Sequence, residues 1–148
     1  MLPPGQIEIL DHIADKALVA CARTLPDLFI TAAWGMFSLM VPMEAVPEIE
    51  QRDVAVEADS LEDLFVAWLR ELHYLSEVEK LVFGRFALRE LAEPSAPASR
   101  WRLRGSAWGG PSQAIEHTGA WVKAVTYHNL SVQRRQDGAY CAQVTFDV

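Results

Sequence analysis

Short stretches of alternating hydrophobic and polar residues recur along this chain, and this pattern is typical of half-buried β-strands. The clearest stretch is residues 140–146, whose hydrophobic side chains share one face: Tyr140, Ala142, Val144 and Phe146. Similar patterns predict further strands at residues 6–10, 16–22, 52–58, 82–91, 100–108, 122–127 and 130–135. The alternation therefore indicates a domain in which strands predominate.

Two stretches instead place their hydrophobic residues at helical spacing. The first helix is predicted to begin at Thr24, whose hydroxyl can cap it, with Pro26 and Asp27 in the first turn. Its hydrophobic positions are Leu28, Phe29, Ala32, Ala33, Met36 and Leu39. The second helix is predicted to follow Ser60 as its cap. Its hydrophobic stripe is Leu61, Leu64, Phe65, Trp68, Leu69, Leu72 and Leu75, which we interpret as a core-facing surface.

The predicted elements follow the order β-β-α-β-α-β-β-β-β-β. The short links between the strands favour antiparallel pairing. We therefore expect a single compact α+β domain, residues 1–148, in which two amphipathic helices pack on a mostly antiparallel sheet. Residues 112–120 are expected to add one or two helical turns.

The composition narrows the class of protein further. Hydrophobic residues make up 51% of the chain, but no stretch approaches the ~20 apolar residues of a membrane span. We therefore expect no membrane association. Cys21 and Cys141 are too few for a disulfide framework and lack the spacing of a metal site. We interpret both as ordinary buried thiols, and we expect the protein to be cytoplasmic.

The charge pattern argues against broad, direct binding of nucleic acid. The net charge is −7, whereas such binding needs a positive field. One predicted strand nevertheless carries Arg100, Arg102 and Arg104 on a single face. This face is interpreted either as a solvated outer surface or as a local contact to RNA or to an acidic partner.

Acidic groups gather at two places that a sheet could bring together. The sequence ends on Asp147-Val148 directly after a predicted strand, and Asp15 lies in the link between the first two strands. Calcium and magnesium prefer carboxylate, carbonyl and water oxygens, so Asp15, Asp147 and a terminal oxygen of Val148 could bind such a cation. His12 could instead favour zinc or manganese. The alternative is that these carboxylates are ordinary solvated groups.

Residues 121–130 contain two further groups that could take part in chemistry. Lys123 could hold a phosphate, or it could extend into solvent like most lysines. His128 could act as a general base, but no serine or cysteine in a suitable local context accompanies it. The chain has no glycine-rich phosphate loop and no HExxH or CxxC motif. A nucleophilic triad is therefore not expected.

Four motifs together resemble the archease family. Residues 11–15, DHIAD, resemble the family's HTAD-type motif with isoleucine in place of threonine. Residues 64–72, LFVAWLREL, resemble its LLVDWLNELL helix, and residues 122–128, VKAVTYH, match its VKAVTYH strand. The sequence also ends in aspartate followed by an aliphatic residue. The order and the spacing of all four match, and together they span most of the chain.

The resemblance implies a role as well as a fold. Archeases assist the GTP-dependent RNA-splicing ligase, in which they promote guanylylation of the active-site histidine and allow multiple turnovers. They also broaden the nucleotide use of the ligase. On this basis the chain is expected to be an activator of a partner ligase and not an enzyme, with RNA contacted only indirectly or weakly.

The resemblance also implies a metal site. Its ligands would be Asp15, Asp147 and the terminal oxygens of Val148, and the expected divalent metal is calcium, with magnesium, manganese and zinc as alternatives. Residues expected beside the metal or in contact with the partner are Asp11, His12 and Lys123. One departure is Gly105-Ser106, where the family often has Gly-Glu. This change removes an acid that could have supported the metal or the partner contact.

Two other functions stay open at this stage. A metal-dependent phosphoester hydrolase could use Asp15, Asp147 and His128, and it would turn over substrate without a partner. A chaperone-like binding module would have no site chemistry, so charge changes at the two aspartates would alter only its stability.

Overall fold

The computed structural model describes residues 2–11, 14–117 and 119–148. In chain order its strands and helices are β1 (Gln6–Asp11), β2 (Asp15–Ala22), α1 (Leu25–Ser38), the short 3-10 helix η1 (Met43–Ala45), β3 (Glu50–Ala58), α2 (Leu61–Glu79), β4 (Leu81–Ala92), β5 (Trp101–Pro111), the 3-10 helix η2 (Ser112–Ala114), β6 (Ala124–Arg134) and β7 (Tyr140–Asp147). The predicted α+β class is confirmed.

Both helices begin where the sequence predicts. The Thr24 hydroxyl accepts a hydrogen bond from the Asp27 amide at 3.2 Å, and the Ser60 hydroxyl accepts one from the Asp63 amide at 3.1 Å. Each cap satisfies one of the amides that a helix leaves unpaired at its start. Helix α2 ends at Lys80, which adopts the left-handed conformation with φ of 55°. Within the described ranges, no helix combines the length and the apolarity needed to cross a membrane.

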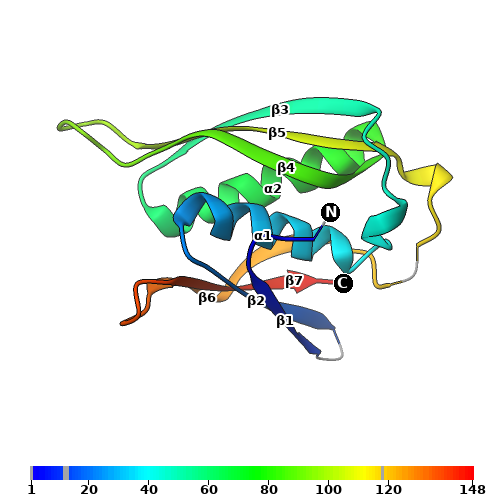
Figure 1. Ribbon diagram of the computed structural model, residues 1–148, viewed down its shortest axis with the longest axis horizontal. Coiled ribbons are helices and arrows are strands. Elements are labelled where there is room, and N and C mark those ends of the chain that lie inside the picture. The colour runs from blue at the N-terminus through cyan, green and yellow to red at the C-terminus, as the bar shows by residue number, and fades with distance from the viewer. Residues whose placement is uncertain (1, 12–13, 118) are drawn as a thin grey trace.

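The strands form two antiparallel sheets, where the sequence predicted one. Within the described residues, one sheet has the order β1-β2-β7-β6 and the other has the order β3-β5-β4. Figure 1 shows both helices lying between the two sheets. Helix α1 is accordingly buried on most of its surface, including Phe29, Ala32, Met36 and Phe37. Each sheet therefore has one face against the helices and one outer face.

The core lies in the helix layer and the inner faces of both sheets. The predicted stripe of α2 is confirmed as a core surface, since Leu64, Phe65 and Trp68 are fully buried. The Trp68 indole donates a hydrogen bond to the Phe29 carbonyl at 2.9 Å, so its polar edge is satisfied inside the core. This contact links α2 to α1 within the layer that separates the sheets.

Strand β6 replaces the two strands predicted at residues 122–127 and 130–135. Its pairing with β7 is irregular, because Thr126 lies opposite Thr145 while Ser131 lies opposite Gln143. The extra residues of β6 bulge away from the ladder, and Asn129 adopts a positive φ of 54°. The predicted break is thus a bulge within one strand. The predicted helical turns at residues 112–120 are represented in the described residues by η2.

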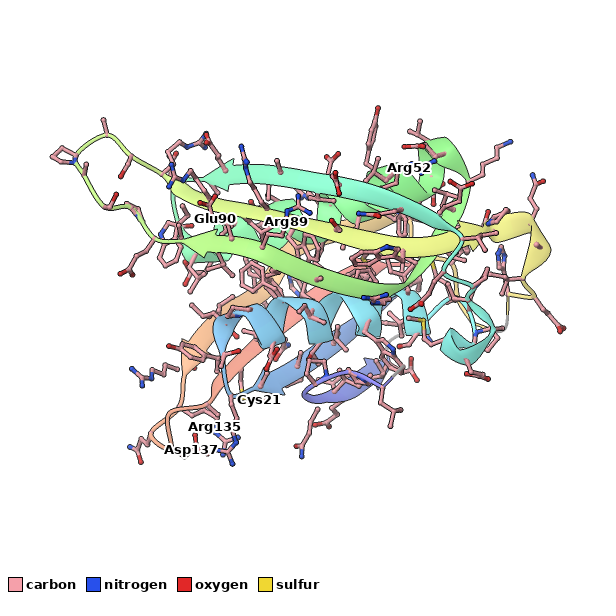
Figure 2. All side chains as sticks on the ribbon, turned by 45° about the horizontal axis from the view of Figure 1, so that its top comes forward. Cys21, Arg52, Arg89, Glu90, Arg135 and Asp137 are labelled. Atoms are coloured by element: carbon pink, nitrogen blue, oxygen red, sulfur yellow. A yellow bond between two sulfur atoms is a disulfide. The ribbon has the colours of Figure 1, made fainter. Side chains whose placement is uncertain are left out.

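The prediction that both cysteines are ordinary buried thiols is wrong. Cys21 and Cys141 form a disulfide, with their Cα atoms 4.1 Å apart. Both residues are only half-buried, and Cys21 is labelled in Figure 2. The ladder between β2 and β7 places them directly opposite each other across a sequence separation of 120 residues. The spacing of the cysteines in the sequence could not predict this pair, because the two strands are far apart along the chain. The expected cytoplasmic location was based partly on free thiols and loses that support.

Candidate functional site

The pairing of β2 with β7 brings Asp15 and Asp147 together. The two residues are direct partners in the antiparallel ladder. Leu18, on the alternate face of β2, is buried against the helices, so both aspartates face outward. Side chains that lie directly opposite in such a ladder have their Cβ atoms roughly 4.5–5.5 Å apart. The two carboxylates are therefore neighbours on the outer face of this sheet.

Main-chain hydrogen bonds hold the last residues in place on both sides. The Val148 amide donates to the Ala14 carbonyl at 3.4 Å, and the Lys123 amide donates to the Asp147 carbonyl at 2.7 Å. The Val148 side chain also packs against the core. Terminal residues are usually poorly ordered unless they are tied down in this way. The backbone oxygens of Val148 are thus kept close to Asp15 and Asp147.

The Asp15 carboxylate carries the strongest sign of a missing partner. Its Oδ1 atom is buried and accepts no hydrogen bond in the described part of the chain. Leaving a buried acceptor unpaired costs about 1–3 kcal/mol, and more when the group is charged. Asp147 is exposed, so the pair is open to solvent on one side. A hard cation would satisfy the buried oxygen, and the donor set fits calcium or magnesium.

The described side chains do not supply a metal site by themselves. Among residues 2–11, 14–117 and 119–148, no group of three or more His, Cys, Asp or Glu side chains could hold a metal ion. The candidate set therefore consists of two carboxylates and depends on main-chain oxygens and water for its other ligands. A site of this kind would be open and would bind a cation weakly.

The other predicted site residues lie at different places around this pair. Asp11 forms an ion pair with Lys16 at 3.0 Å and stands opposite Lys16 in the ladder, so it is on the other face of the sheet from Asp15. His12 lies outside the described residues. Lys123 is exposed and is tied to Asp147 through its main-chain amide. The structure therefore brings the main chain of Lys123 to the acidic pair but does not bring Asp11 there.

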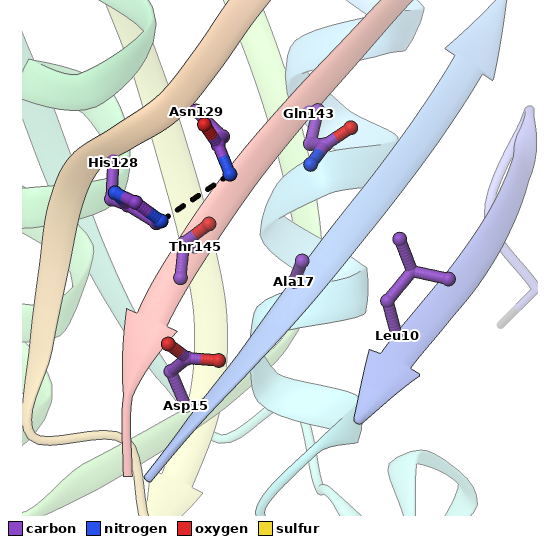
Figure 3. A pocket seen from close by; sticks show the side chains of 7 residues that line it. All are labelled: Leu10, Asp15, Ala17, His128, Asn129, Gln143 and Thr145. Atoms are coloured by element: carbon purple, nitrogen blue, oxygen red, sulfur yellow. Dashed lines mark hydrogen bonds between the residues drawn. The ribbon is translucent and has the colours of Figure 1, made fainter. Parts of the chain in front are cut away.

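A pocket of about 270 Å³ opens beside Asp15 on the same outer face. Its lining consists of Leu10, Asp15, Ala17, His128, Asn129, Gln143 and Thr145. Figure 3 shows His128 and Asn129 reaching from the bulge of β6 toward β7. The Asn129 amide donates a hydrogen bond to His128 Nε2 at 3.3 Å. The bulge thus adds polar side chains to a site that the two aspartates define.

Sequence reasoning did not assign Asn129, Gln143 or Thr145 to this site. A signal for two of them was present, because Gln143 and Thr145 alternate with the apolar residues of the last strand and share a face with Asp147. The position of Asn129 depends on the bulge in β6, which the local pattern does not reveal.

Comparison with known proteins identifies the family of the chain. The model of the archease protein family (MTH1598/TM1083) matches residues 7–148. The chain belongs to the archease family. An archease from Methanopyrus kandleri is 34% identical over 142 residues, which cover 95% of this chain and 98% of that protein. An archease from Pyrococcus furiosus is 32% identical over 144 residues, with coverage of 97% and 99%.

A solved structure supports the same assignment. The solution structure of Methanobacterium thermoautotrophicum protein 1598 superposes with a TM-score of 0.79 at 26% identity. The match covers 96% of this chain and 98% of that one. The likeness to archeases therefore extends over both sheets and both helices, and is not confined to the short motifs.

The arginines at the start of β5 and just before it lie on the other sheet, and two of them are paired within the chain. Arg100 Nε donates to Asp59 at 2.9 Å, and Arg102 lies 3.9 Å from Glu90. Arg89 and Glu90, on neighbouring β4, are labelled on this sheet in Figure 2. Because carboxylates of the chain already neutralise much of this face, the structure favours a solvated ion-pair surface over an RNA contact.

Ser106, the departure from the family pattern, lies far from the acidic pair in the fold. Its hydroxyl donates to Asp53 at 2.8 Å and accepts from Arg89 at 2.6 Å, and the bond from Ser106 is the main cause that lowers the pKa of Asp53. Strand β5 belongs to the β3-β5-β4 sheet, whereas Asp15 belongs to the other sheet. An acid at position 106 would therefore not be a ligand beside Asp15.

Tyr127, next to the bulge, is expected to make the free energy of unfolding fall measurably as pH rises in the alkaline range. Partial burial and the hydrogen bond that its hydroxyl donates to Asp63 at 2.9 Å raise the pKa of Tyr127 above 10.0. The unfolded phenol therefore loses its proton first, and the folded state loses stability as pH rises above about 10. Denaturant unfolding between pH 9 and 11 should show a steeper loss for the wild type than for Tyr127→Phe. Parallel curves for the two proteins would contradict this assignment.

Proposed function

We propose that this chain activates a GTP-dependent RNA-splicing ligase by promoting guanylylation and multiple turnover of that enzyme. Membership of the archease family supports the role. The observation that carries the proposal is the buried, unpaired Oδ1 of Asp15 beside the exposed Asp147. This arrangement places negative charge where a cation from outside the chain would bind.

The proposed site binds one divalent cation, for which we favour calcium. Asp15, Asp147 and the oxygens of Val148 would hold it, and Lys123 would lie beside it. When bound, the cation would neutralise the acidic cluster and supply positive charge near phosphate oxygens. Guanylyl transfer depends mainly on positioning and on neutralising phosphate charge, so an accessory protein can act through these two effects. The residues of this chain would hold the cation and contact the ligase.

The features of the site favour an accessory role over free-standing catalysis. Asp147 is exposed, and the sequence lacks a glycine-rich phosphate loop that would hold a nucleotide. The net charge of −7 disfavours strong binding of RNA, so the proposed partner is the ligase protein. The cytoplasmic location stays a prediction.

Label transfer from GTP to the ligase tests the proposal at the level of single residues. Wild-type protein is expected to accelerate guanylylation of the ligase, and Asp147→Ala is expected to bring the rate back to that of the ligase alone. Asp59→Ala is the matched control, because Asp59 is an exposed carboxylate next to the opposite sheet. Full stimulation by folded Asp147→Ala would contradict the role of the acidic site.

A metal-dependent phosphoester hydrolase is the second candidate, because His128 and Asp15 line the same pocket. In that case His128 would act as general base, and the protein would cleave a phosphoester with a divalent metal and no partner. Assays with calcium, magnesium, manganese and zinc distinguish the two functions. Partner-free turnover that His128→Ala abolishes would favour hydrolysis, whereas stimulation of the ligase without such turnover would favour activation.

A further inference from the structure

The segment from Trp121 to Tyr127, which includes the start of β6, runs along α2 in the opposite direction and is joined to it by hydrogen bonds. The Trp121 indole donates to Glu77 at 2.7 Å, and the Tyr127 hydroxyl donates to Asp63 at 2.9 Å. Between them, the Val122 carbonyl is hydrogen-bonded to His73 at 2.9 Å and the Val125 carbonyl accepts from Arg70 at 3.0 Å. Four contacts spread over four turns of the helix make this a rigid seam. Lys123, whose amide binds Asp147, lies inside the same segment.

Three large hydrophobic side chains along this seam are exposed to solvent. Tyr74 is 57% exposed, Val78 is 59% exposed and Tyr127 is 48% exposed. Tyr74 and Val78 are one turn apart on α2, and Tyr74 is one turn beyond Arg70, which lies 5.0 Å from the centre of the Tyr127 ring. We call Tyr74, Val78, Tyr127 and Trp121 the α2 ridge. Single exposed hydrophobic residues are normal, but several along one seam mark an interaction surface.

The α2 ridge has the composition and the rigidity of a protein-binding surface. Tyrosine, tryptophan and arginine dominate binding energy at protein interfaces, and Arg70 adjoins the ridge. The hydroxyl of Tyr127 is held by Asp63 and the Trp121 indole by Glu77. The Trp121 ring also contacts the His117 ring in a tilted arrangement, with the ring centres 4.5 Å apart. Because these rings are already fixed, they lose less conformational entropy when a partner binds them.

The charge around the α2 ridge indicates what kind of partner it fits. Helix α2 carries Glu62, Asp63, Glu71 and Glu77 against the single Arg70, while its last acid, Glu79, is already paired with Arg52 of β3 at 2.7 Å. An acidic surface repels RNA and also repels a second copy of a chain whose net charge is −7. The complementary surface is therefore a protein surface with apolar side chains at its centre and lysine or arginine at its rim.

We propose that the α2 ridge is the docking surface for the ligase, separate from the acidic site that alters the reaction. This inference rests on the proposed function, because it takes the ligase as the partner. The seam connects the two places, since Lys123 lies between Trp121 and Tyr127 and its amide binds Asp147. A ligase seated on the α2 ridge thus has the acidic site beside it.

Binding and activation should then be separable by mutation. The double variant Tyr74→Ala/Val78→Ala is expected to raise the Kd for the ligase at least about tenfold, the effect of losing a binding hot spot. Stimulation at saturating protein is expected to match the wild type. Alanine is a better helix former than tyrosine or valine, so α2 is retained. Ile49→Ala is the matched control, because Ile49 is 70% exposed outside the α2 ridge.

Binding by calorimetry at several salt concentrations, together with guanylylation, gives distinct outcomes. A raised Kd with normal maximal stimulation, and wild-type binding that weakens as salt rises, support the docking surface. An unchanged Kd in the double variant, while the wild type binds and stimulates the ligase, overturns this inference alone. A wild type that neither binds nor stimulates the ligase overturns the proposed function as well. A dimer in light scattering that the double variant dissociates would show that a second copy covers the α2 ridge.

Discussion

Calcium at a hundredfold excess over its Kd is expected to raise the Tm of the wild-type protein by about 5 to 10 °C and to leave Asp15→Asn almost unchanged. A ligand at that excess stabilises the folded state by about 2.7 kcal/mol, and a domain of this size shifts by a few degrees per kcal/mol. The reason lies in Asp15, whose buried Oδ1 lacks a hydrogen-bond partner among the described residues. Differential scanning fluorimetry with a calcium titration measures the shift.

The same experiment has an internal control at Asp11, the last residue of β1. Asp11→Asn should keep the full calcium response, because Asp11 pairs with Lys16 on the opposite face of the sheet. Without calcium, Asp15→Asn should be at least as stable as the wild type, since it removes the charge of a buried, unpaired oxygen. A full calcium shift in Asp15→Asn, or a wild type that responds to no divalent cation, would contradict the metal site.

Loss of the disulfide is expected to have the largest effect on stability. The Cys21–Cys141 bond spans a sequence separation of 120 residues. Closing a loop of that length restricts the unfolded chain, and the chain-entropy model assigns it about 4–5 kcal/mol. Cys21→Ser/Cys141→Ser should therefore unfold at a much lower urea concentration than the oxidised wild type. The comparison should be made by equilibrium denaturation with intrinsic tryptophan fluorescence.

Reducing agent provides the control for this prediction. It should destabilise the wild type toward the double serine variant and should not affect the variant itself. Equal urea midpoints for oxidised and reduced wild type would show that the bond adds no net stability. The disulfide joins the same two strands that hold Asp15 opposite Asp147. Calcium binding by the reduced protein would therefore show whether the pairing of β2 with β7 holds without the bond.

Features that depend on neighbouring residues could be predicted from the sequence. The caps at Thr24 and Ser60 lie where expected, because the side chain and the amide that it binds are three residues apart. The core stripe of α2 follows from helical spacing for the same reason. The α+β class follows from the order of the elements.

Features that depend on distant residues could not be predicted in this way. Alternation shows that a strand has an inner and an outer face, but it does not show that the strands divide into two sheets around a helix layer. Cys21 and Cys141 become partners only through the register of β2 with β7. Likewise, the bulge that carries Asn129 arises from the mismatch in length between β6 and β7.

The candidate site shows the same division. The resemblance to archeases indicated Asp15 and Asp147, and strand register makes them neighbours. The same resemblance indicated Asp11, which the ladder places on the other face of the sheet. The unpaired oxygen of Asp15 and the exposed residues of the α2 ridge depend on three-dimensional packing, so only the structure reveals them.

The most direct test of the central claim counts the RNA molecules that each ligase molecule seals when RNA and GTP are in excess. Activation predicts that the ligase alone stops near a single round and that the wild-type protein lets it continue for many rounds. It also predicts that Asp147→Ala leaves the ligase near a single round. Product counts that folded wild-type protein does not increase, at concentrations that saturate the ligase, would contradict the account.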